Sequence, residues 1–231
     1  MNDKLLNKMF MTALWVNVFS ILMAVIGVSI DGLLIARYFG ADAIAGYGLN
    51  MPLLSFNATA AGILPAGIGV FVAKYTAMGD RKTANDYFHT VLISSVGLSS
   101  LLALMLLLFS EHIVAWLGAA AGTAVFGCAD DYLRGMSISF PFLAFVLAAQ
   151  PAAVLCGRKN LVYKTGLITT AANIIADILN IFVLKQGMLG MGLCTSLANG
   201  LAAGIILRVF LRDDIYLKIS EGRFSEYNDR G

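Results

Sequence analysis

Six apolar stretches, each long enough to cross a membrane, follow one another along the chain. They lie at about residues 9–36, 47–73, 88–109, 135–156, 165–184 and 187–207. A helix that crosses the hydrocarbon core of a bilayer needs roughly 20 mainly apolar residues. Charged residues make up 13% of the chain, whereas a soluble domain carries about 25%. The sequence therefore predicts an all-α membrane protein with six transmembrane helices over residues 1–211.

The distribution of Lys and Arg predicts the orientation of these spans. With six spans, both termini and the second and fourth loops share one side of the membrane. Thirteen of the 16 basic residues fall on that side, and the other side holds only Arg37, Arg134 and Lys185. Because cytoplasmic loops are enriched in Lys and Arg, we expect both termini in the cytoplasm of a cell-membrane protein. The net charge of +2 thus reflects topology, and no nucleic-acid partner is expected.

The segments outside the spans carry fewer signals. Residues 111–131 are expected to form an outer loop with a solvated Asp130–Asp131 pair, and Trp116 and Tyr132 are expected to anchor its ends at the interface. Residues 212–231 are polar and predict a cytoplasmic tail or an interdomain linker. The three cysteines show no metal-binding or disulfide spacing. The glycines at 62, 67, 69, 187, 190 and 192 are expected to allow close helix packing.

Two acidic residues, Asp31 and Asp177, lie inside apolar spans and have no basic residue in the same span. A charge at the centre of a bilayer costs about 2.5–3.5 kcal/mol on insertion scales. Asn173 and Asp177 are four residues apart and therefore share one face of a helix. Carboxylate, amide and hydroxyl oxygens suit a hard monovalent cation, and a carboxylate screened from water can instead hold a proton. These residues are candidates for an ion or proton site.

Other polar residues in the spans have two interpretations. Asn17, Asn57, Asn180 and Asn199 could line a cavity, or they could form interhelical hydrogen bonds worth about 0.6 kcal/mol each. Thr195 and Asn199 are four residues apart in the sixth span, so they too share a face.

Several segments in order resemble the multidrug and toxic compound extrusion (MATE) family. They are SIDGLLIARYFGADAIAGYGLNMP at 29–52, VAKYTAMGDRKTA at 72–84, YLRG at 132–135 and ANIIADILNIFVLKQGMLGMGLCTSLANG at 172–200. The resemblance covers nearly the whole chain, which departs from the family pattern near Val16, where a proline is usual. It implies one six-helix lobe of a twelve-helix transporter, with residues 212–231 at the connection between lobes.

The resemblance also implies a function and a site. The family's cation-site ligands match Asp31, Asn173, Asp177 and Thr195, which would bind Na⁺ or carry H⁺. The implied activity is cation-coupled antiport of amphipathic or cationic drugs, with no cofactor other than the coupling ion. A second six-helix lobe, either another copy or a separate chain, is expected as partner.

Two alternatives stay open, and a third class of function is not expected. A lipid or polysaccharide flippase of the same superfamily would need more basic residues facing its cavity. A lobe without transport activity would serve as a subunit that waits for a partner. A membrane-embedded enzyme is not expected, because the sequence shows no nucleophile–base pair and no cluster of acids or histidines around Asp177.

Overall fold

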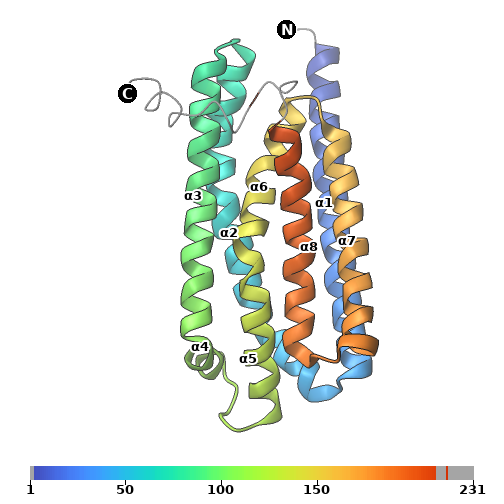
Figure 1. Ribbon diagram of the computed structural model, residues 1–231. Helices are drawn as coiled ribbons and strands as arrows, with labels where there is room; N and C mark the ends of the chain where they lie inside the picture. The colour runs from blue at the N-terminus through green and yellow to red at the C-terminus, as the bar shows by residue number, and fades with distance from the viewer. Residues whose placement is uncertain (1–2, 212–216, 218–231) are drawn as a thin grey trace.

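The computed structural model describes residues 3–211 and 217, which contain helices and no β-strand (Figure 1). The elements are α1 (Asp3–Tyr38), α2 (Ala41–Ala77), α3 (Arg81–Leu108), α4 (Ser110–Trp116), α5 (Ala124–Ser137), α6 (Ser139–Leu155), α7 (Lys159–Leu179), the π-helical turn η1 (Asn180–Leu184) and α8 (Gly187–Phe210). Apart from Leu217, the polar segment expected at 212–231 lies outside the described residues.

Five of the helices are long and apolar enough to cross a membrane, namely α1, α2, α3, α7 with η1, and α8. The pair α5 and α6 bends by 46° at Ile138 and makes a sixth span if it is counted as one. The expected all-α membrane architecture is confirmed. Most of the helices extend beyond the apolar windows, because their terminal turns carry the polar and charged residues that follow each window.

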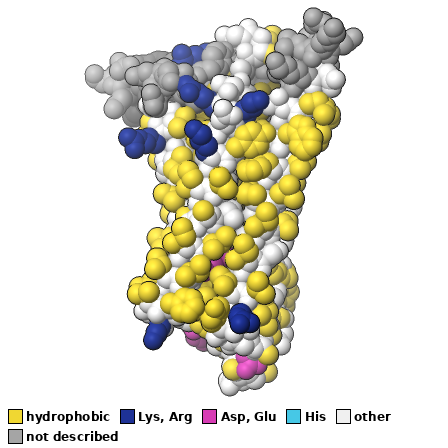
Figure 2. Space-filling model, turned by 90° about the vertical axis from the view of Figure 1, so that its right-hand side faces the viewer, with side chains coloured by type: hydrophobic (Ala, Val, Ile, Leu, Met, Phe, Trp, Pro, Cys, Tyr) yellow, Lys and Arg dark blue, Asp and Glu magenta, His cyan; other side chains and the backbone are white. Residues whose placement is uncertain are grey.

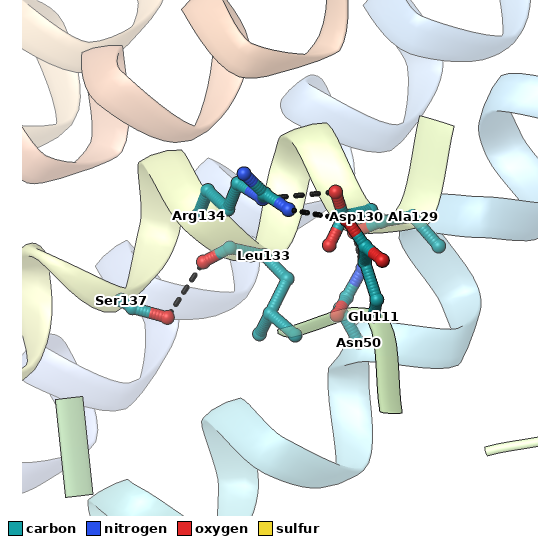
Figure 3. Close-up of polar contacts among 7 residues, drawn as sticks. All are labelled: Asn50, Glu111, Ala129, Asp130, Leu133, Arg134 and Ser137. Carbon is teal, nitrogen blue, oxygen red and sulfur yellow. Dashed lines mark hydrogen bonds and ion pairs between the residues drawn. The ribbon is translucent and has the colours of Figure 1, made fainter. Parts of the chain in front are cut away.

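The segment expected to be an outer loop instead contains the helix α4 and most of α5. Thr123 caps α5, since its hydroxyl oxygen accepts a hydrogen bond from the amide of Phe126 at 3.2 Å. Asp130 is not a free loop residue, because its carboxylate lies 2.9 Å from the guanidinium of Arg134. Figure 3 shows the Arg134 guanidinium joined to both Asp130 and Glu111, and the oxygen of Glu111 is 3.1 Å away. The sequence did not predict α5 because its charged residues interrupt the apolar pattern, although one face of this helix is buried.

The helices form one elongated bundle with two different ends (Figure 1). Both described termini, the α2–α3 turn and the α6–α7 turn lie at one end, which we call the basic end. Figure 2 shows most of the visible Lys and Arg side chains just inside that end and hydrophobic side chains around the middle of the bundle. Large apolar side chains such as Phe10, Trp15 and Ile21 of α1 are more than half exposed. An outer surface of this kind suits contact with lipid.

The core is divided into two apolar clusters, one in each half of the bundle. In the basic half, Phe88 of α3 and Phe210 of α8 pack with their ring centroids 5.3 Å apart. In the other half, the buried side chains of Tyr132, Met136 and Phe140 fill the space around α5. Because that second half also contains Asp31 and Asp177, we call it the acid half.

Close contact between α5 and α8 fixes the packing of the acid half. A Cβ atom on Gly192 would lie 2.6 Å from the carbonyl oxygen of Tyr132, and one on Gly135 would lie 2.5 Å from that of Leu189. Neither position accommodates a side chain while the backbones stay where they are. The two glycines therefore let α8 approach α5 closely.

The turn between α7 and α8 is closed by Asn180. The backbone amide of Lys185 donates to the carbonyl oxygen of Asn180 at 2.7 Å, a π-helical bond that widens the last turn. The side-chain amide of Asn180 donates to the carbonyl oxygen of Gly187 at 3.0 Å, and its oxygen accepts from the amide of Gln186 at 3.1 Å. Two antiparallel spans thus meet in a short turn whose polar groups are satisfied inside the protein.

Candidate cation or proton site

Three of the predicted site residues come together between α1 and α7. The side-chain nitrogen of Asn173 donates to Asp31 at 2.7 Å and to Asp177 at 3.3 Å. Asp31 is 6% exposed, Asn173 7% and Asp177 0%. One amide therefore bridges two carboxyl groups from different helices, in a place closed to solvent.

Parallel packing of α1 against α7 produces this arrangement. Phe19 packs edge-on against Tyr163 with ring centroids 4.9 Å apart. One to two turns further along, the hydroxyl of Thr170 donates to the carbonyl oxygen of Met23 at 3.5 Å. The same register continues to Asp31 and Asn173. The four-residue spacing of Asn173 and Asp177 then directs both side chains toward α1.

The site has oxygen atoms without partners and no compensating positive charge. The side-chain oxygen of Asn173 and the Oδ1 atom of Asp177 are buried and accept no hydrogen bond within the described residues. Within the described residues, no Lys, Arg or His side chain forms an ion pair with Asp31 or Asp177. Two carboxylates cannot share such an environment without a proton or a cation between them. The donor set is made of oxygen atoms, which suits a hard cation.

Residues of α2, α5 and α8 surround the acid pair. The side chain of Cys194 on α8 lies beside that of Asp177. Tyr47 donates to the carbonyl oxygen of Val28 at 3.2 Å and packs against Tyr132 with ring centroids 5.1 Å apart. These groups exclude water and hold α1 in place.

Thr195 makes no hydrogen bond with Asp31 or Asp177. Its hydroxyl donates to the carbonyl oxygen of Met191 at 3.4 Å, and its side chain lies near that of Tyr132. The structure therefore brings Asp31, Asn173 and Asp177 into direct contact, while Thr195 lies in the surrounding layer next to Cys194.

The four asparagines considered as cavity-lining residues have different surroundings. Asn17 lines a cavity of about 600 Å³ in the basic half. Asn57 is fully buried, Asn180 closes the α7–η1–α8 turn, and Asn199 is half-buried on α8. None of these last three is among the residues that line the cavity.

Sequence reasoning missed Tyr47, Tyr132 and Cys194. Tyr132 was expected at the membrane interface, but it is 2% exposed and packs in the core of the acid half. Cys194 shows no metal-binding or disulfide spacing in the sequence, although its position directly before Thr195 is a signal that could have placed it near the site. Tyr47 gave no signal beyond its place at the start of an apolar span.

A multi-pass helical membrane protein with an intramembrane acid site is the class that this fold and this site define. A family model described as MatE matches residues 17–183. The chain therefore belongs to the MatE family of multidrug and toxic compound extrusion proteins.

Similar proteins share the fold at low sequence identity. The chain is 22% identical over 177 residues to the multidrug export protein MepA of Staphylococcus aureus strain bovine RF122 / ET3-1, which covers 77% of this chain and 39% of that protein. It is 24% identical over 170 residues to MepA of Staphylococcus haemolyticus, covering 73% and 37%. The chain thus spans less than half the length of these relatives.

Solved structures also share the fold at low sequence identity and over less than half of their length. A crystal structure of MATE in the bent conformation matches with a TM-score of 0.77 at 21% identity, over 87% of this chain and 44% of that one. The inward-facing conformation of a multidrug resistance MATE family transporter of the MOP superfamily matches with a TM-score of 0.76 at 19% identity, over 84% and 44%. At these identities the likeness concerns the fold alone.

Proposed function

We propose that this chain forms one lobe of a cation-coupled antiporter that exports drugs or organic cations. The observation that carries the proposal is the Asp31–Asn173–Asp177 cluster, which is buried, lacks a basic partner within the described residues and has two oxygens without hydrogen bonds. A charged group inside a membrane is costly unless it is used. The multidrug export activity named for MepA supports the same assignment.

In this proposal the acid pair binds and releases the coupling ion. A Na⁺ ion would take the carboxylate oxygens of Asp31 and Asp177 and the amide oxygen of Asn173, with Thr195 as a further oxygen donor after a small shift. A proton would instead sit between the two carboxyl groups. In either state the ion lowers the electrostatic repulsion between α1 and α7, so its arrival and departure change how firmly these helices hold together.

The distribution of charge supports one orientation in the cell membrane. Basic residues at the basic end include Lys74, Arg81, Lys82, Arg158 and Lys159. We propose that this end faces the cytoplasm, because Lys and Arg accumulate on that side of membrane proteins. Both termini would then be cytoplasmic, and the α1–α2 turn would face outward.

A second lobe is part of the proposal. The match covers 44% of the bent-conformation MATE chain, and secondary transporters move one repeat against another around a central site. The second lobe would be another copy of this chain or a separate chain. The alternative is a lobe that does not transport without a partner, and ethidium accumulation distinguishes it from a lobe that transports alone.

A flippase for lipids or polysaccharides has less support. Arg134 is engaged by Glu111 and Asp130 (Figure 3), and the described residues that line the cavity in the basic half carry no charge. An anionic headgroup would have no counterion there.

Ethidium accumulation in cells that lack their own drug pumps tests the proposal. Cells that express the chain should accumulate less ethidium than empty-vector cells, and Asp177→Asn should abolish the difference. Asp131→Asn makes the same chemical change at an exposed position of α5 and should have no effect.

Two results would contradict the proposal in different ways. Efflux that persists in Asp177→Asn would overturn the cation-site assignment. Accumulation equal to the empty vector, with insertion of the wild-type chain in the membrane verified, would establish a lobe that does not transport alone. Repeating the assay without Na⁺ and at different external pH identifies the coupling ion.

A further inference from the structure

Buried polar side chains separate the two apolar clusters of the core. On α3, the last buried residue of the basic-half cluster is Leu92, and the first buried residue of the acid-half cluster is Ala103. The two buried residues between them are Ser95 and Ser99. On α2, the buried Asn57 also lies between the residues of the two clusters. The middle of the bundle therefore contains polar groups, which we call the polar layer.

The polar layer also includes the start of α6, where Ser139 is buried. The helices α2, α3 and α6 pack against one another, and the end of α2, the start of α3 and the end of α6 point toward the basic end (Figure 1). Asn57, Ser99 and Ser139 are 20, 18 and 16 residues from those helix ends, which is about 24–30 Å of helix. The three helices thus place their polar residues at a similar level of the bundle.

The side chains of the polar layer lack hydrogen-bond partners. The nitrogen and oxygen of the Asn57 amide and the hydroxyl oxygens of Ser95, Ser99 and Ser139 are buried and have no partner within the described residues. Buried polar groups in proteins are nearly always hydrogen-bonded, and the hydrocarbon around a membrane protein supplies neither donors nor acceptors. These atoms from three helices therefore need a partner that the neighbouring side chains do not provide.

The break between α5 and α6 adds a backbone acceptor next to Ser139. The span bends by 46° at this break. Pro141 has no N–H, so the carbonyl oxygen of Ser137, four residues earlier, loses its α-helical donor. The hydroxyl of Ser137 donates to the carbonyl oxygen of Leu133 at 2.6 Å (Figure 3) and is already used. A carbonyl freed inside a membrane span needs another donor.

We propose that the polar layer between α2, α3 and the α5–α6 break is a binding site for ordered water. Water donates and accepts hydrogen bonds, as the amide, the hydroxyls and the carbonyl require, and a buried water molecule makes about three of them. All of these groups are neutral, so they offer a cation no opposite charge, unlike Asp31 and Asp177. An apolar occupant would leave the same atoms without partners. Water inserted beside a proline is also a cause of helix bending, which agrees with the bend at this break.

The direct test is a structure of the purified chain in phosphatidylcholine nanodiscs at a resolution that shows ordered water. Water density is expected about 2.7–3.2 Å from the Asn57 amide and from the hydroxyl of Ser99 or Ser139. Clear density for these side chains without a water peak between them would overturn the proposal.

Thermal unfolding gives an independent test. The double variant Ser95→Ala/Ser99→Ala removes two partners of the water without adding volume, and the Tm should fall by about 2–4 °C for each lost hydroxyl. In a dry layer the same change would remove two unsatisfied groups, so the Tm would stay equal or rise, and this result would overturn the proposal.

The matched control is Ser94→Ala/Ser100→Ala, which makes the same two substitutions at less buried positions of α3. Its Tm should equal that of the wild-type chain. An equal fall in both double variants would show that loss of serine hydroxyls from α3 is destabilising wherever they lie, and it would also contradict the proposed water site.

Discussion

Two sets of glycines, one in each half of the bundle, have opposite surroundings. In the acid half, the glycines at 46, 135, 190 and 192 stand where another backbone or the Asn180 side chain leaves no room for a Cβ atom. In the basic half, Gly62, Gly67 and Gly69 of α2 have no atom within 4 Å of that position. The sequence predicts close packing at all of these helical glycines except those at 46 and 135, which it does not single out. The prediction is confirmed at Gly190 and Gly192 and wrong at Gly62, Gly67 and Gly69, and also at Gly187, where no atom lies within 4 Å.

The difference corresponds to what each half contains. An acid pair bridged by one amide depends on fixed distances, since a shift of about 1 Å breaks a hydrogen bond. The cavity in the basic half, whose walls come from α1, α2, α3 and α6 and include Gly62 and Gly69, depends on unfilled volume. A short helical segment rich in glycine therefore has no single meaning, and only the neighbouring elements decide whether it serves packing or space.

The largest expected effect comes from removing the bridge in the acid half. Asn173→Leu deletes the donor to both Asp31 and Asp177, and hydrogen bonds to charged groups are worth about 1.5–3 kcal/mol each. Binding of the coupling ion should weaken about tenfold or more, measured as the cation concentration that gives half-maximal ethidium efflux. Asn199→Leu is the matched change on α8 and should leave that concentration unaltered. A similar shift in both variants would show that loss of any side-chain amide inside the bundle weakens ion binding, and that the bridge between Asp31 and Asp177 has no special role.

Packing in the acid half is the next test. Gly192→Ala would place a Cβ atom 2.6 Å from the Tyr132 carbonyl oxygen, and overpacking of this kind costs about 1–3 kcal/mol. The Tm in detergent should fall. Gly97→Ala makes the same substitution where no atom lies within 4 Å, so its Tm should equal or exceed the wild-type value. If Gly192→Ala were as stable as Gly97→Ala, the close backbone contact at Gly192 would not be what requires a glycine there.

A smaller effect is expected at the outer end of the acid half. Arg134→Gln removes the ion pairs with Glu111 and Asp130, but the Arg134 and Glu111 side chains are 43% and 66% exposed. Exposed ion pairs contribute about 0–1 kcal/mol, so the Tm should decrease slightly and high salt should reduce the difference. A large loss of ethidium efflux with an unchanged Tm would assign Arg134 a role in transport and revive the flippase alternative.

The smallest effect concerns pH at the basic end. Hydrogen bonding by Thr83, whose amide donates at 3.1 Å, holds the pKa of the Asp80 carboxyl below its ordinary value. A lowered pKa means that this stabilisation is complete above the unfolded-state value of 3.8 and is lost only as the pH falls through the lower folded-state value. Asp80→Asn, which can still cap α3, should therefore leave the pH profile of efflux unchanged near neutrality. A shifted profile would mean that pH acts on the α2–α3 turn as well as on the acid pair.

Periodicity and composition predicted much of this architecture. Apolar windows predicted the membrane helices, and the four-residue spacing of Asn173 and Asp177 predicted their common face. The contact of both with Asp31 joins residues 142 positions apart, and only the family resemblance indicated it. The helix α5 was missed because Asp130, Asp131 and Arg134 interrupt its apolar pattern. The cavity could not be predicted, because it depends on how four helices diverge and not on any local pattern.

The π-helical turn at Asn180–Leu184 has a consequence for sequence variation in this family. Its hydrogen bond from residue 185 to residue 180 accommodates one more residue than an α-helical turn does. Deleting a residue there would move Lys185 and Gln186 by about 100° around the axis of α7, away from the position in which Gln186 and Gly187 bond the Asn180 side chain. The number of residues in this turn, as much as their identity, thus determines how α8 is joined to α7.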